Sequence, residues 1–302
     1  MNADNAPAAP DINTPREKNT PLVYLVIGPA GSGRRALLAD IIAGGLGADE
    51  HALVLLSKDE SDNAPDAGLR AAGGCVARWG WLERGGGPDG PGGRIETGDT
   101  GAGGAGGATH VFFVADGRRN PVDQIEAFKP WLQAFGGELA RVMCVVDCAL
   151  GSQHRELLAW LDACVHFSDI VLLARREGAP GKWVSDFQAR YKDRFYPCLF
   201  EFVKGGVVRN PLLVLVPETR RMSHYFDEPS YELAGGGGIE EGFDDDDAPA
   251  KRKSDDRIEV VEETDEFLAR RAGGRRVREI PDIARYLGGS PGSSSPTSAR
   301  AS

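Results

Sequence analysis

The sequence predicts an α/β protein in which a doubly wound, mostly parallel sheet carries helices on both faces. Six apolar runs are spaced so that helices fit between them: residues 22–28, 52–57, 110–116, 141–147, 169–174 and 197–203. These runs are unbroken, which is typical of strands that are covered on both faces. Right-handed connections between parallel strands produce a doubly wound sheet. In such sheets ligands bind at the carboxyl ends of the strands, so any ligand is expected there.

The segments between the runs carry apolar residues at helical spacing. The first set is Leu37, Leu38, Ile41 and Ile42. Similar sets lie within residues 122–135, 157–165 and 183–191. Each set forms one face of an expected helix. Residues 204–218 leave two possibilities open, a seventh strand or irregular cover.

The domain organisation follows from changes in composition. Residues 1–20 predict a disordered leader and residues 21–221 one nucleotide-binding domain. Within it, the glycine-rich insertion 85–108 lacks periodicity and predicts a mobile loop. Residues 222–302 are of low complexity and predict a largely disordered tail. Within that tail, residues 257–288 are expected either to stay solvated or to form short helices on a protein partner.

The charge and the apolar pattern exclude some classes of function. The chain has 302 residues and a net charge of −10, and residues 225–302 are more acidic than the rest. No basic stripe is present, which disfavours nucleic acid as a partner. No apolar run reaches the length of a membrane span, and residues 1–21 do not resemble a signal peptide, so a cytoplasmic protein is expected. Five cysteines favour reduced, buried thiols.

A phosphate-binding motif follows the first apolar run. The sequence "GPAGSGRR" matches G-x-x-x-x-G-K-[ST] at Gly28 and Gly33, lies after an expected strand and opens an expected helix. Glycines allow successive backbone N–H groups to face an anion, and the helix N-terminus adds its dipole. The predicted nucleotide-binding residues of the loop are Gly28, Gly31, Ser32, Gly33, Arg34 and Arg35. The alternative is a glycine-rich turn that binds nothing.

Two side chains of the motif differ from the usual pattern. Arg34 stands at the lysine position, and Arg35 replaces the hydroxyl residue that normally ligates Mg²⁺. Arginine is wider and planar, although it can still contact phosphate. Because Mg²⁺ demands near-octahedral coordination, the lost hydroxyl puts metal-assisted hydrolysis in doubt. Arg34 is expected at an exposed loop end, where its replacement would leave the fold intact.

The order of motifs over residues 21–203 resembles the CobW/HypB/UreG family of P-loop metallochaperone GTPases, the CobW-like branch in particular. The loop "GPAGSGRRALL" is similar to the family's GFLGSGKTTLL, and "VADGRRNPVDQIEAF" to its acidic switch. The resemblance implies that Asp116 orients a magnesium-bound water. It also matches Asp147 to the Asp of the family's VVDA strand.

Other family motifs are altered in this sequence. The metal motif of the type GCxCC retains Cys75 alone, and a single thiol is a poor metal site. The guanine-reading segment aligns Ala174, Arg175, Arg176 and Glu177 with Asn, Lys, any residue and Asp. Glu177 would then be the acceptor for a guanine edge. Four departures together indicate a degenerate member of the family that kept the fold.

Further polar and aromatic residues have simpler interpretations. Cys144 and Cys148 share a face of one strand and are expected to pack. His154 and His166 are expected to be surface or hydrogen-bonded histidines, and no nucleophile-elbow motif appears. Trp79 and Trp81 are expected to anchor the core or a loop rather than a ligand.

Three functional hypotheses follow. The first is a CobW-like domain that binds a nucleotide, GTP or ATP, as a binding or scaffolding protein with little or no hydrolysis. The second is an active GTPase in metal delivery, in which Arg34 replaces lysine, Asp116 handles Mg²⁺ or water and Glu177 reads the base. The third is a nucleotide-free module that recruits protein partners through its C-terminal tail.

Overall fold

The computed structural model describes residues 20–60, 64–87, 90–98, 107–227 and 265–287. Its strands are β1 Leu22–Ile27, β2 Ala52–Ser57, β3 Gly74–Gly87, β4 Gly90–Thr97, β5 His110–Val114, β6 Glu138–Asp147, β7 Ile170–Ala174, β8 Leu199–Lys204 and β9 Val207–Val208. Its α-helices are α1 Arg34–Gly45, α2 Ala64–Ala71, α3 Pro121–Phe135, α4 Cys148–Gln153, α5 Leu158–His166, α6 Gly181–Lys192 and α7 Pro211–Leu215. Short 3₁₀ turns are η1 Arg155–Leu157, η2 Arg176–Gly178 and η3 Ile283–Arg285.

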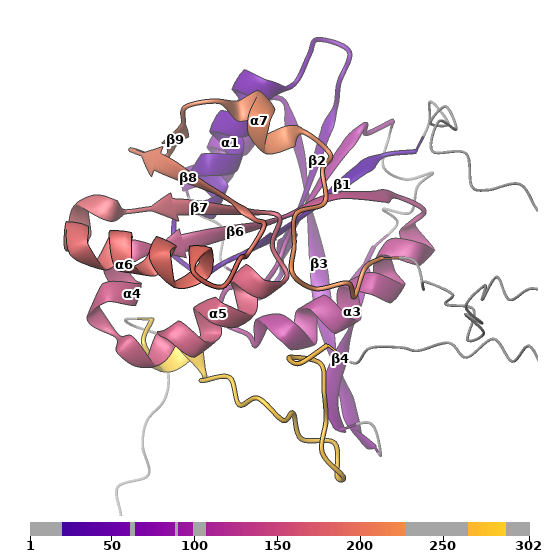
Figure 1. The fold of residues 1–302 in the computed structure, drawn as a ribbon. Coiled ribbons are helices and arrows are strands. Elements are labelled where there is room, and N and C mark those ends of the chain that lie inside the picture. Colours follow the sequence, from indigo (N-terminus) through magenta and orange to yellow (C-terminus); the bar gives the residue numbers. More distant parts are fainter. Residues whose placement is uncertain (1–19, 61–63, 88–89, 99–106, 228–264, 288–302) are drawn as a thin grey trace, which may run out of the picture.

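Across the described ranges, the strands form one sheet in the order β4-β3-β2-β5-β1-β6-β7-β8-β9 (Figure 1). The pairs from β3 to β8 in this order are all parallel, and only the outer pairs β3–β4 and β8–β9 are antiparallel. This arrangement confirms the predicted fold class. After β1 the chain builds β2 to β5 on one side of this strand and β6 to β9 on the other, so the topological switch point lies at the end of β1.

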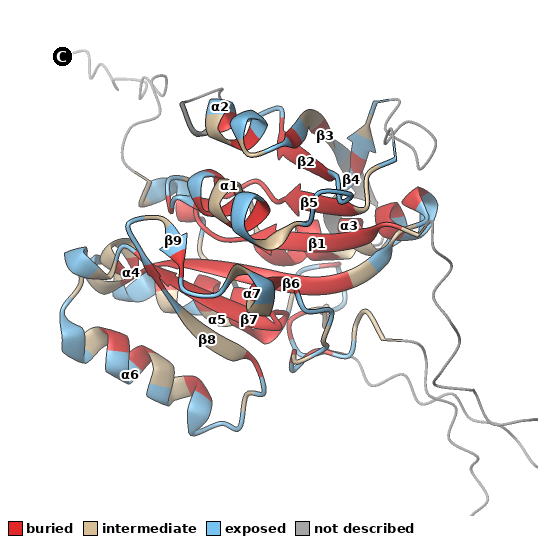
Figure 2. Ribbon diagram, turned by 90° about the horizontal axis from the view of Figure 1, so that it is seen from above, coloured by how far each residue is buried: buried red, intermediate tan, exposed pale blue. Residues whose placement is uncertain are grey.

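Alternating side chains of the central strands pack into two hydrophobic layers. One layer joins the sheet to α3, α5 and α6, and the other joins it to α1, α2 and α7. Figure 2 shows the buried residues concentrated in the central strands, with exposed residues on the outer sides of the helices. Coverage on both faces explains why the runs of β1, β2, β5, β6 and β7 are unbroken and apolar, whereas β8, near the edge of the sheet, is partly exposed. All six predicted strands are present, as are the four predicted helical segments.

The glycine-rich insertion differs from its predicted structure. Residues 85–87 extend β3, and residues 90–97 form the antiparallel strand β4, so the prediction of a mobile loop is wrong there. The hairpin is anchored by tryptophan. Trp79 is fully buried, and the ring of Trp81 lies where a Cβ on Gly93 would come within 2.1 Å. Glycine at 93 therefore makes room for an aromatic ring, a packing role that composition conceals. Residues 99–106 lie outside the described part.

The segment after β8 resolves the alternative left open by the sequence. It forms the two-residue strand β9 and the short helix α7, whose buried Val214 and Leu215 cover the α1 side of the sheet. Among the described residues, no helix is long and apolar enough to cross a bilayer.

Part of the predicted tail lies on the domain. Residues 265–287, the yellow coil beneath α3 and α5 in Figure 1, bury Phe267 and Ile283 in the layer that contains those helices. Asp265 pairs with His166 Nε2 at 2.8 Å, and Arg276 binds Asp123 on α3. Only η3 is helical there, so the predicted solvated or partner-bound helices are replaced by contacts within the chain. The disorder predicted for 1–19, 228–264 and 288–302 falls outside the described residues.

Candidate functional site

The loop between β1 and α1 lies at the switch point of the sheet. Gly28, Gly31 and Gly33 have φ angles of 144°, 81° and 90°, which favour glycine. A Cβ at Gly28 would come within 2.4 Å of the carbonyl oxygen of Val145 on β6, so only glycine fits there. A Cβ at Gly31 or Gly33 would meet no atom within 4 Å. The loop is therefore packed on its β6 side and open at its tip.

The backbone N–H groups of the loop divide into two sets. Ala30 N donates to Gly117 O at 3.0 Å, and Ser32 N donates to Pro29 O at 3.2 Å. The amides of Gly31, Gly33 and Arg34 donate to no acceptor within the described ranges. The last two open the twelve-residue helix α1, where unpaired N–H groups and the helix dipole favour an anion. The described structure therefore leaves these three N–H groups without an acceptor at the open tip of the loop.

The side chain of Arg34 does not lie over this tip. Its guanidinium donates to Ala115 O at the end of β5, and its Nη2 lies 2.6 Å from Glu60 Oε1. Arg34 is only 4% exposed, so the expectation of an exposed loop end is wrong. The reason is that two neighbouring strands, β2 and β5, end beside the loop and supply acceptors for the guanidinium.

Arg35 is also buried in ion pairs. It binds Glu60 Oε2 at 2.9 Å and Asp66 Oδ1 at 2.7 Å, and Arg78 on β3 binds the other oxygen of Asp66 at 2.9 Å. We call Arg34, Arg35, Arg78, Glu60 and Asp66 the arginine–carboxylate network. Two cations at a helix N-terminus oppose the helix dipole, and the two carboxylates offset that repulsion.

Glu60 is the centre of this network. Burial alone would raise its pKa, but the charge of Arg34 and hydrogen bonds from Gly117 N, Arg34 and Arg35 outweigh burial and lower the pKa to about 2. Glu60 and Asp66 were not predicted from the sequence. For Glu60 the available signal was its place three residues after the apolar run 52–57, at the carboxyl end of a predicted strand, whereas Asp66 lies further on, in the first turn of α2.

Asp116, the predicted catalytic acid, is held in a turn. Its carboxylate accepts from Arg118 N at 2.9 Å and lies 3.3 Å from Arg119 Nε. Burial raises the pKa of Asp116, the neighbouring charge of Glu60 adds to that rise, and the hydrogen bond from Arg118 N opposes it. Gln124 holds the same turn from α3, because its amide bonds both the N–H and the carbonyl of Asp116.

These residues do not fit a magnesium ion. Arg35 presents a guanidinium where a hydroxyl ligand is needed, and that guanidinium is already bound to two carboxylates. The carboxylate of Asp116 is engaged by Arg118 and Arg119. A magnesium ion here would have to displace the guanidinium of Arg35 from Glu60 and Asp66, or the groups of Arg118 and Arg119 from Asp116.

The opposite side of the loop is tied to the strands that follow it. Arg175 Nη1 donates to Gly31 O at 3.2 Å and to Asp147 Oδ2 at 3.0 Å, which joins the loop tip to the ends of β6 and β7. Asp147 also caps α4 through Leu150 N. Glu177 lies in η2, two residues after Arg175, and is exposed. The structure therefore places Glu177 on the same edge of the sheet as the loop.

Cys75 lies away from these residues. It is the second residue of β3 and pairs in register with Leu53 near the start of β2, whereas the loop follows the end of β1. Parallel strands place these positions at opposite ends of the sheet. Cys75 is exposed, and the described residues contain no cluster of three or more His, Cys, Asp or Glu suited to a metal. Cys75 thus has no partner ligands in the described structure.

The remaining candidates are part of the packing. Cys144 and Cys148 are buried in the α3–α5 layer, and burial raises the pKa of Cys148 to about 12. Trp79 stacks on Phe113 with centroids 4.9 Å apart and donates from Nε1 to Val114 O, which confirms its structural role. His154 lies beside Tyr286.

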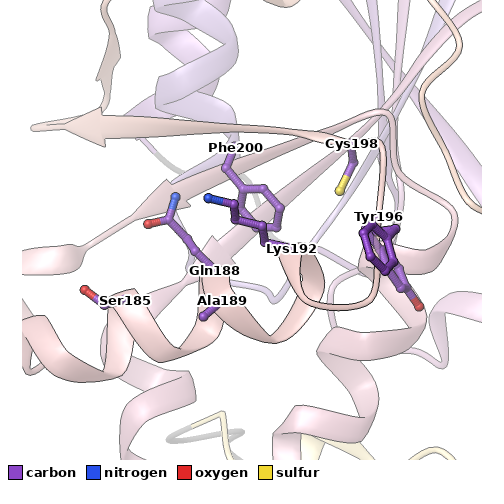
Figure 3. A pocket seen from close by; sticks show the side chains of 8 residues that line it. Ser185, Gln188, Ala189, Lys192, Tyr196, Cys198 and Phe200 are labelled. Atoms are coloured by element: carbon purple, nitrogen blue, oxygen red, sulfur yellow. The ribbon is translucent and has the colours of Figure 1, made fainter.

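A cavity of about 660 Å³ is lined by residues of α6, of the turn after it and of β8 (Figure 3). Its lining includes Lys192, Tyr196, Cys198 and Phe200. None of the predicted site residues lines it.

No protein-family model matches the sequence, and a search of curated proteins finds no relative. Several solved structures resemble the chain in fold. The Zn(II)-bound YjiA GTPase from E. coli is 15% identical, with 67% of each chain covered and a TM-score of 0.38. HypB from Helicobacter pylori in complex with nickel is 10% identical, with 61% of this chain and 79% of that chain covered and a TM-score of 0.36. The signal recognition particle receptor FtsY from Elizabethkingia anophelis in complex with GDP is 13% identical, with 66% and 64% covered and a TM-score of 0.40. Similarity at this level says nothing about what this chain binds.

Proposed function

We propose that this domain is a P-loop binding or scaffolding protein that holds a nucleoside phosphate, of the guanine type, with little or no hydrolysis. The phosphates would lie against the amides of Gly31, Gly33 and Arg34. The base would lie towards η2, where Glu177 is the carboxylate available to accept from a guanine edge.

The open tip of the loop carries this proposal. Three amides without an acceptor among the described residues lie where a helix begins and where two glycines leave open space. Such an arrangement favours phosphate through backbone groups alone, before any side chain contributes. The tip also lies at the switch point of the sheet, where ligands of doubly wound folds bind.

The side chains argue against hydrolysis. Phosphoryl transfer in P-loop proteins depends on a lysine at the phosphates and on Mg²⁺ held by a hydroxyl. Here the guanidinium of Arg34 is bound to Glu60 and Ala115, and Arg35 is bound to Glu60 and Asp66. Neither residue is placed to assist transfer. An active GTPase in metal delivery is therefore the weaker candidate.

A nucleotide-free interaction protein is the second candidate. The arginine–carboxylate network favours it, because Arg34 and Arg35 are neutralised by the chain itself and need no bound anion. The C-terminal segment was the expected recruiting element. Its described part lies on its own domain, so recruitment through residues 265–287 would require their release.

One titration separates these candidates. The full chain is titrated with labelled GTP, GDP, ATP and ADP, with and without Mg²⁺, and released phosphate is then measured. Binding of a guanine nucleotide without phosphate release is the expected result. Magnesium-dependent release would favour the active GTPase, and no binding at millimolar nucleotide would favour the interaction protein.

A further inference from the structure

Glu60 accepts three hydrogen bonds from the two segments that border the loop. Oε1 accepts from Arg34 Nη2 at 2.6 Å and from Gly117 N at 3.0 Å. Oε2 accepts from Arg35 Nη2 at 2.9 Å. Two guanidinium groups and a backbone N–H thus converge on one buried anion. A convergence of this kind is how proteins hold the oxygens of a phosphate group.

The place of this carboxylate relative to the loop determines what a ligand would meet. In P-loop proteins the lysine of the motif, at the position that Arg34 occupies here, reaches the β- and γ-phosphates, while the backbone amides hold the α- and β-phosphates. In this chain the guanidinium of Arg34 instead donates to Glu60. The bond from Ala30 N to Gly117 O also closes the loop against the turn after β5.

The loop is tightly packed against the turn at Gly117. A Cβ on Gly117 would lie 2.1 Å from Ala30 N and 2.5 Å from Arg34 Nη2, so the gap cannot hold even a methyl group. At the tip, Gly31 and Gly33 have free space beyond them. The loop therefore has room for phosphates over the tip but not between Ala30 and Gly117.

We propose that Glu60 is an internal anion in the place of a terminal phosphate, so that the site accepts a nucleoside diphosphate and excludes a triphosphate. This inference rests on the proposed nucleotide binding. A third phosphate would have to separate Gly117 from Ala30 and take Arg34 from Glu60. It would also bring like charges together, because Glu60 stays ionised beside it.

The test uses the full chain without added metal. GDP and GTP are titrated by calorimetry, together with inorganic diphosphate and triphosphate. The wild-type protein is expected to bind GDP at least about ten-fold more tightly than GTP, and diphosphate more tightly than triphosphate. Glu60→Gln keeps the size of the side chain and removes its charge. In this variant the preference for GDP should shrink to about three-fold or less.

Asp66→Asn is the matched control. It neutralises the other carboxylate of the network, which binds Arg35 and Arg78 but neither Arg34 nor Gly117. Its preference for GDP should equal that of the wild type. If Glu60→Gln does not fold, as judged by circular dichroism, the inorganic series on the wild-type protein decides the question.

Each outcome has a distinct meaning. Equal affinity of the wild type for GDP and GTP overturns this inference and leaves the proposed nucleotide binding intact. The inference also fails if a folded Glu60→Gln variant keeps the full preference, or if Asp66→Asn removes it equally. Binding of none of the four ligands overturns the proposed function and this inference together.

Discussion

Nη2 of Arg34 and Oε1 of Glu60 lie 2.6 Å apart, and both side chains are at least nine-tenths buried. The pair joins the first residue of α1 to the turn that follows β2. A cation at a helix N-terminus is unfavourable by itself, so Arg34 depends on a carboxylate at this place. The pair therefore ties the loop to the sheet and fixes the direction of the Arg34 side chain.

Removal of Arg34 should destabilise the fold. Arg34→Ala leaves Glu60 buried without its strongest partner, and the loss of one member of a buried pair typically costs about 3–5 kcal/mol. We expect a decrease of that order in the free energy of unfolding, measured by denaturant titration. Arg175→Ala is the control, because Arg175 is 55% exposed and its pair with Asp147 should contribute about 1 kcal/mol or less. Equal stability of Arg34→Ala and the wild type would contradict the buried pair.

Because the pKa of Glu60 is lowered, the free energy of unfolding should decrease at acidic pH. Because the folded-state pKa of about 2 lies below the ordinary value of 4.5, the carboxylate stabilises the fold above pH 4.5 and loses this effect as the pH falls towards 2. The loss over that window should be on the order of 3 kcal/mol. Unfolding titrations at several pH values measure it.

Glu60→Gln should flatten the pH dependence of stability over this window, since glutamine does not titrate. Glu83→Gln is the matched control, because Glu83 is 72% exposed and binds only Arg119 in the pairs described. It should keep the wild-type slope. A wild-type slope in Glu60→Gln would assign the acid sensitivity to other carboxylates.

The sequence was sufficient for the parts of the fold that are governed by local pattern. Each of the six apolar runs forms a strand, and in all but β8 burial on both faces accounts for the continuous apolar residues. The β3–β4 hairpin was missed because its stability comes from Trp79 and Trp81, which act across strands. A glycine-rich composition suggests a flexible segment, yet here Gly93 leaves the space that the ring of Trp81 occupies.

The candidate site was predicted in its backbone but not in its side chains. The glycines of the loop adopt positive φ angles, as the motif implies. The direction of Arg34 was not predictable, because its partner Glu60 is 26 residues away and meets it only through the order of β2, β5 and β1. For the same reason, burial of Phe267 against the domain could not be read from a segment rich in charges.

Gly117 predicts a steric effect on the loop. In Gly117→Ala the new methyl group would collide with Ala30 N and Arg34 Nη2, and overpacking of this kind costs typically about 1–3 kcal/mol. We expect a lower free energy of unfolding by that amount. Gly181→Ala is the control. A Cβ at Gly181 meets no atom within 4 Å at the start of α6, so this change should be neutral or stabilising by up to about 1 kcal/mol. Similar stabilities of the two variants would show that the loop and the turn at Gly117 are further apart than described.

Two adjacent arginines provide a sharp test of the docked C-terminal segment. The side chain of Arg276 is 9% exposed and binds Asp123 and Glu126 on α3, whereas that of Arg275 is 81% exposed and pairs only with Glu279 among the recorded ion pairs. Hydrogen bonds to charged groups contribute about 1.5–3 kcal/mol when they are partly buried. Arg276→Ala should therefore speed amide hydrogen exchange of residues 265–287 by about ten-fold to a hundred-fold, with β1, β5 and β6 unchanged. Arg275→Ala should leave exchange at the wild-type rate. If both variants exchange alike, the ion pairs of Arg276 with Asp123 and Glu126 contribute nothing to the docking of the segment.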